Sequence, residues 1–114
     1  MGGAVNVPGN VDGANAEWNV WVDVPAAAAV ISLGVPVTLV PLDATNFVPI
    51  PAWYQRALSE AKQSNAIVYL ERMVGLFSAV TSGFYFMWDE LAASVAAGET
   101  YTTTKEMSIV VIEG

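Results

Sequence analysis

Apolar and polar residues occur in blocks along this chain, and the blocks predict helices joined to strand-length segments. Residues 6–16 are rich in Gly, Asn, Asp and Pro, which is the composition of an exposed loop. Asp23 is placed to cap a helix at 26–33, and Gly34 stands where a C-terminal glycine cap belongs. Residues 35–42 follow as a nearly continuous apolar run, typical of a strand covered on both faces of a parallel sheet. This order of helix, glycine and strand predicts an α/β fold.

The second half of the chain is predicted to hold three further helices and a final strand. Residues 66–88 are strongly apolar, but Glu71 and Arg72 interrupt them, whereas a membrane-spanning helix needs about 20 largely uncharged residues. A buried helix is therefore the better interpretation, and residues 1–114 are predicted to be one domain or a piece of one. The expected elements are a polar helix at 53–63, a helix from Ala66 to Ser82, a short helix at 89–98 closed by Gly98, and a strand at 105–114.

Composition and charge narrow the possible functions. Hydrophobic residues make up 54% of the chain and charged residues 13%, which excludes a disordered segment. The net charge of −7 repels phosphate backbones and anionic lipids, so neither a nucleic acid nor a membrane is expected as a partner. The chain has no cysteine and no histidine, which excludes disulfides, zinc–thiolate sites and proton transfer by histidine. A soluble, cytoplasmic protein is expected.

Three segments, in this order, carry a resemblance to a known family. The first is MGGAVNVPGNVDGANAEWNVWVDVPAAA, which matches a Met-Gly-Gly start, a Gly-Asn loop, an Ala-Glu-aromatic-Asn motif and a helix opened by Asp and Pro. The second, VPVTLVPLDAT, matches a strand followed by a Leu-Asp-x-Thr loop, and the third, MWDELAAS, stands where the family has a His-Asp-x-Leu-Ala helix start. Together these segments resemble the C-terminal part of an inosine–uridine-preferring nucleoside hydrolase.

The resemblance implies a Rossmann-like α/β fold and cleavage of the N-glycosidic bond between a nucleobase and ribose. It also implies a calcium ion that helps to deliver the attacking water and contacts the ribose hydroxyls. Glycosidic cleavage passes through an oxocarbenium-like state, so negative charge and hydroxyl-binding groups are needed around the sugar. The expected ligand is a small-molecule nucleoside, and homo-oligomers are possible.

Family residues can be carried over where this sequence matches the motifs. Asn10, Glu17 and Asn19 match residues that bind the ribose, and Met1 matches a methionine of the sugar pocket. The full assignment for substrate binding is Met1, Asn10, Glu17, Asn19 and Trp88, and for the metal it is Asp89.

Two departures from the family pattern affect the expected chemistry. Trp88 stands where many members have a histidine that assists departure of the base, so we expect its indole to stack on the base instead. The aspartate cluster that supplies most calcium ligands and the general base is missing, since no two aspartates here lie within four residues of each other. No catalytic residue is therefore assigned, and the chain by itself is expected to be inactive.

Simpler interpretations stay open for the same residues and for the function. Asn10 is explained as a turn residue, Asp89 as a helix cap, and Glu17 and Asn19 as an exposed strand face. A local turn explains Asp43 equally well, so it is left out of the site. The alternatives to a hydrolase are a non-catalytic nucleoside- or sugar-binding module and a structural piece that a partner chain completes.

Overall fold

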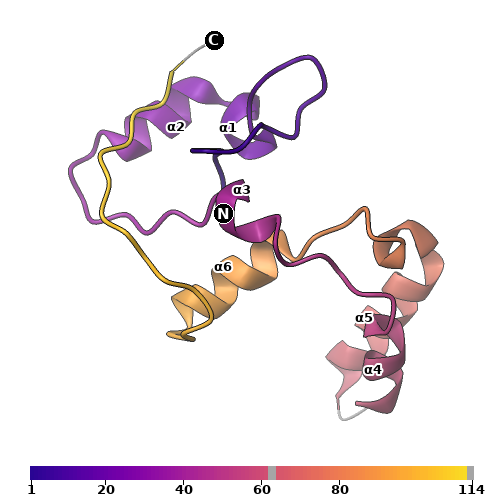
Figure 1. Cartoon of the computed structure of the whole chain (residues 1–114). Coiled ribbons are helices and arrows are strands. Elements are labelled where there is room, and N and C mark those ends of the chain that lie inside the picture. Colours follow the sequence, from indigo (N-terminus) through magenta and orange to yellow (C-terminus); the bar gives the residue numbers. More distant parts are fainter. Residues whose placement is uncertain (62–63, 113–114) are drawn as a thin grey trace. The chain divides into compact units, whose positions relative to one another are not determined.

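The computed structural model describes residues 1–61 and 64–112, and it divides the chain into two compact units. The first unit combines Met1–Asn46 with the chain from Trp88 onward, and the second is Phe47–Met87. Helices form all the regular elements of the described residues (Figure 1). In chain order they are α1 (Trp18–Val22), α2 (Val24–Ile31), α3 (Leu42–Thr45), α4 (Tyr54–Glu60), α5 (Asn65–Leu76), the 3₁₀ helix η1 (Ser78–Thr81) and α6 (Trp88–Ala96).

The prediction of an α/β fold with a Rossmann-like sheet is wrong. The described part of the chain contains no strand, and its β-type pairing is limited to two isolated bridges, Val11–Ala14 and Pro49–Phe86. Of the predicted strand at 35–42, the first seven residues are irregular and Leu42 begins α3; residues 105–112 of the second predicted strand are irregular too. An apolar run indicates burial, but a strand also needs a neighbour that pairs with its main-chain groups.

Two main-chain hydrogen bonds join the start of the chain to the segment before α3. The Gly2 N–H donates to the Val40 carbonyl at 3.2 Å, and the Leu42 N–H donates to the Gly3 carbonyl at 2.9 Å. The partners advance in the same direction along both segments, as in parallel pairing, but with unequal steps. Gly3 has a φ of +82°, a conformation that glycine adopts readily and other residues avoid. The contact therefore anchors the first residues without starting a sheet.

Predictions that rest on local capping are confirmed. Asp23 is the N-cap of α2, and its Oδ1 accepts a hydrogen bond from the Ala26 N–H at 2.9 Å. Gly34 follows α2 with a φ of +68°, and Gly98 follows α6 with a φ of +88°. These features need only neighbours in the sequence, which is why the residue pattern predicts them.

The second unit is a helical hairpin in which α4 packs against α5. Ser64 caps α5 by accepting the Ile67 N–H at 3.3 Å, while Leu58 and Val74 are buried. The helix predicted from Ala66 to Ser82 ends earlier, at Leu76, and η1 follows it. The last two residues of the helix predicted at 53–63 lie outside the described residues.

The core of the first unit lies where α3 packs against α6. Val40, Leu42 and Leu91 are buried there, together with Thr45, which is fully buried. Many other apolar side chains remain exposed, including Val35 at 56% and Ile112 at 80%. No helix among the described residues is long and apolar enough to cross a membrane.

The loop before α1 closes on the main chain of Ala16. The Asn10 and Val11 N–H groups both donate to the Ala16 carbonyl, at 3.0 and 3.2 Å. Gly9 lies so close to Ala16 that a Cβ at position 9 would overlap its main-chain atoms. A glycine at position 9 is therefore required for this loop closure.

The substitution Gly9→Ala is expected to lower the free energy of unfolding of the first unit by about 1–3 kcal/mol, because the methyl group forces the loop apart. Urea unfolding followed by tryptophan fluorescence measures this. Gly13→Asn is the matched control, since Gly13 has a φ of +77°, which asparagine tolerates, and no atom within 4 Å of an added Cβ. Equal losses in the two variants would contradict the role of the Gly9–Ala16 contact.

Candidate functional site

Glu17 is a buried carboxylate at the start of α1. Its side chain is 3% exposed, and it is the N-cap residue of the helix. Its Oε2 accepts a hydrogen bond from the Val20 N–H at 3.2 Å, as an N-cap side chain does for the unpaired donors of a first turn. The same Oε2 accepts the Gly3 N–H at 2.9 Å. One oxygen thus joins the helix start to the first residues of the chain.

Two glycines let the main chain approach this carboxylate. Gly2 is buried, and a Cβ at this position would lie 3.4 Å from Glu17 Oε2 and 3.8 Å from Asn19 Cβ. These are van der Waals distances, so the main chain at Gly2 lies directly against both side chains. The Met-Gly-Gly start therefore packs closely against the residues that the resemblance assigns to the sugar.

Three further predicted residues belong to the same group. Asn19 Nδ2 donates to Met1 Sδ at 3.6 Å, so the polar Asn19 and the apolar Met1 both lie next to the start of α1. Asn10 Oδ1 accepts the Trp18 N–H at 2.9 Å, so the loop residue is also fixed to the first turn of α1. The structure therefore brings Met1, Asn10, Glu17 and Asn19 together, although they span 19 positions of the sequence.

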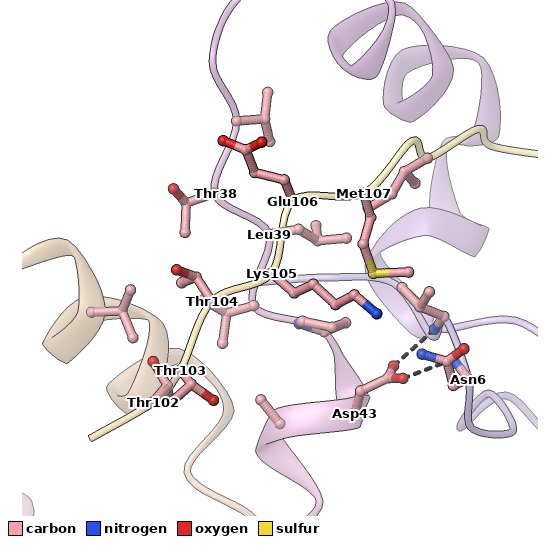
Figure 2. A pocket seen from close by; sticks show the side chains of 17 residues that line it. Asn6, Thr38, Leu39, Asp43, Thr102, Thr103, Thr104, Lys105, Glu106 and Met107 are labelled. Carbon is pink, nitrogen blue, oxygen red and sulfur yellow. Dashed lines mark hydrogen bonds between the residues drawn. The ribbon is translucent and has the colours of Figure 1, made fainter. Parts of the chain in front are cut away.

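Asp43, in the first turn of α3, binds the main chain near the start of the sequence. Its Oδ2 accepts the Val5 N–H at 2.8 Å and its Oδ1 accepts the Asn6 N–H at 2.7 Å (Figure 2). These partners lie 38 and 37 positions away, so the contact extends far beyond a local turn. Asp43 is not among the residues that the sequence assigns to the site. Its place directly after an apolar run was the available signal.

The environment of Asp43 changes its acidity. Burial by itself raises the pKa of the Asp43 carboxyl, because it penalises the charged form. Hydrogen bonds from the main-chain N–H groups of Val5 and Asn6 outweigh this effect, and the pKa lies below its ordinary value of 3.8. Asp43 is therefore ionised near neutral pH and accepts both N–H groups as a carboxylate.

A cavity of about 770 Å³ lies beside Asp43. Its walls are the segment before α3, the chain after α6 and the Val5–Asn6 turn, and its charged lining residues are Asp43, Lys105 and Glu106 (Figure 2). In this view the Lys105 side chain points toward the end of the cavity at which Asp43 and Asn6 lie. None of the six predicted site residues lines this cavity. It is therefore a separate feature from the group around Glu17.

Trp88 and Asp89 stand at the beginning of α6, with Glu90 beside them in the first turn. Trp88 is half-buried and Asp89 is exposed. Helix α6 packs against α3, whereas Glu17 and Asn19 belong to the α1 turn. The assigned roles of Trp88 and Asp89, like those of the other predicted site residues, stay predictions.

The described residues do not fit a complete calcium site. Calcium takes about six to eight oxygen ligands. In residues 1–61 and 64–112, no group of three or more aspartate, glutamate, histidine or cysteine side chains could hold a metal ion. Asp89 therefore stands as one predicted ligand and not as part of an assembled set.

Comparison with known proteins identifies the family. The sequence model of the inosine-uridine preferring nucleoside hydrolases matches residues 1–114. The chain belongs to this family. A nucleoside hydrolase relative, Nucleoside hydrolase 3 from Arabidopsis thaliana, is 38% identical over 86 residues, which are 70% of this chain and 10% of that protein. The chain thus spans about a tenth of the length of that relative. No solved structure matches.

Glu17→Ala is expected to lower the free energy of unfolding of the first unit by about 1.5–3 kcal/mol, because two hydrogen bonds to a buried carboxylate are lost. Hydrogen exchange should show faster exchange at the Gly3 and Val20 amides. Glu17→Gln keeps an acceptor oxygen and should lose less. Glu90→Ala, at an exposed glutamate, is the control. Unchanged exchange at Gly3 in Glu17→Ala would contradict the assigned hydrogen bond.

The Asp43 contact gives a pH dependence. Because the folded-state pKa of Asp43 lies below 3.8, its contribution to stability is fully present above that value and is lost as the pH falls below it. Exchange at the Val5 and Asn6 amides should therefore accelerate, relative to amides of α4, only below pH 3.8. Asp43→Asn should abolish this pH step. A step that persists in Asp43→Asn would assign it to another carboxyl.

Proposed function

We propose that this chain supplies the ribose-binding part of a calcium-dependent hydrolase that cleaves the N-glycosidic bond of purine and pyrimidine ribonucleosides. Membership of the nucleoside hydrolase family supports the reaction class. The observation that carries the sugar-binding role is the meeting of Met1, Asn10, Glu17 and Asn19 at the start of α1.

The chemistry of this group suits a sugar. Both hydrogen bonds to Glu17 use Oε2, so Oε1 takes part in neither and can accept a ribose hydroxyl. The Asn19 amide carries a donor and an acceptor, which can serve hydroxyls in either direction. A carboxylate held next to the sugar also stabilises the positive charge that develops on the ring as the glycosidic bond breaks. Met1 supplies an apolar wall beside these polar groups.

The metal and the base contact complete the proposal. Calcium would supply the activated water and additional hydroxyl contacts, with Asp89 as one of its ligands. Since the described residues do not assemble a calcium site, we propose that the chain by itself binds the sugar without hydrolysing nucleosides. Trp88 is proposed to stack on the nucleobase, where a histidine would otherwise assist the leaving group.

A non-catalytic nucleoside- or sugar-binding module is the second candidate. The same lack of a metal-binding acidic cluster in the described residues favours it. Both candidates require ribose binding, and they differ in whether calcium brings about hydrolysis. A structural piece completed by a partner chain would require neither.

Calorimetric titration of the chain with ribose and with inosine, with and without calcium, tests the proposal. We expect binding of both ligands, and no release of ribose from inosine. Glu17→Ala should abolish binding of both. Trp88→Ala should weaken inosine binding about tenfold while leaving ribose binding unchanged, because the base alone loses its stacking partner. Absence of binding would refute the sugar-binding role, and calcium-dependent ribose release would refute the inactivity of the chain.

A further inference from the structure

We infer that Asp43 is a positioning residue for the sugar-binding group, acting through the main chain of Met1–Asn6. This inference rests on the proposed function and adds a residue to it. Asp43 is not itself one of the residues assigned to the sugar. Its two carboxylate oxygens instead bind the adjacent Val5 and Asn6 N–H groups.

The first six residues are held at successive points by side chains and main chain from two elements. Gly3 N–H is bound by Glu17 of the α1 start, and Val5 and Asn6 are bound by Asp43 of α3. In addition, the Gly2 N–H donates to the Val40 carbonyl and the Gly3 carbonyl accepts the Leu42 N–H. The segment is therefore held by several contacts along its length.

Fixing this segment has a direct effect on the sugar group. Met1 contacts Asn19, and Gly3 contacts the same Oε2 of Glu17 that caps α1. If Val5 and Asn6 were released, residues 1–4 would keep the hydrogen bonds of Gly2 and Gly3 but lose their restraint on the C-terminal side. We expect the position of Met1 against Asn19 to vary more widely as a result. A ligand would then have to order the segment on binding, which lowers its affinity.

The geometry distinguishes Asp43 from an ordinary helix cap. Asp43 lies in the first turn of α3, but its two carboxylate oxygens accept the N–H groups of Val5 and Asn6 in the chain start. Asp23 offers the comparison within the same unit, because its carboxylate also accepts a main-chain N–H but serves the local cap of α2. Removing Asp23 therefore destabilises the unit without releasing the chain start.

The test compares Asp43→Ala, Asp43→Asn and Asp23→Ala by ribose calorimetry, with the free energy of unfolding measured for each. We expect Asp43→Ala to bind ribose at least about tenfold more weakly than the unchanged chain. Asp43→Asn should be intermediate, because it keeps one acceptor oxygen. Asp23→Ala should bind within about twofold of the unchanged chain, even where its stability loss is comparable.

The NMR signal of the Met1 methyl group provides a readout of position. It should shift and broaden in Asp43→Ala and stay in place in Asp23→Ala. Equal ribose affinities in Asp43→Ala and Asp23→Ala, with an unchanged Met1 signal, would overturn the inference while leaving the proposed function intact. An unchanged chain that does not bind ribose would overturn the proposed function and, with it, this inference.

Discussion

The buried Glu17 carboxylate is the interaction on which the rest of the proposed site depends. A carboxylate that is 3% exposed is costly unless its charge is satisfied, and here Oε2 receives the Val20 and Gly3 N–H groups. The hydrogen bond from Val20 caps α1 and so places Asn19. The second draws the chain start against the helix, which brings Met1 to Asn19. The same carboxylate oxygen thus caps the helix and joins the chain start to it.

Glycine at position 3 makes this arrangement possible. Gly2 lies against Glu17, and Gly3 adopts a left-handed φ while its N–H reaches Oε2. Asp43 then holds the following residues with both of its oxygens. Two carboxylates therefore fix one short segment by its main-chain donors. This kind of contact depends on backbone position and tolerates variation in the intervening side chains.

The apolar residues outside this region explain why the fold is less regular than expected. The chain is 54% hydrophobic, but Val35 and Ile112 are among many large apolar side chains that remain exposed. The segments that contain them were predicted to be strands because they are apolar and of strand length. Neither forms a ladder with another described segment, so their side chains do not share a covered sheet face. Exposed apolar groups of this extent favour contact with further protein surface.

The family, the helix caps at Asp23 and Gly34, and the set of residues matched to the sugar could be predicted from the sequence alone. Caps involve groups a few positions apart, and motifs are read directly from residue order, so neither needs knowledge of the fold. The folded structure was needed to show that Glu17 is joined to Gly3, that Asp43 holds Val5 and Asn6, and that the predicted strands are irregular. These outcomes depend on partners 14 to 38 positions away, and hydrophobic pattern specifies burial without specifying the partner.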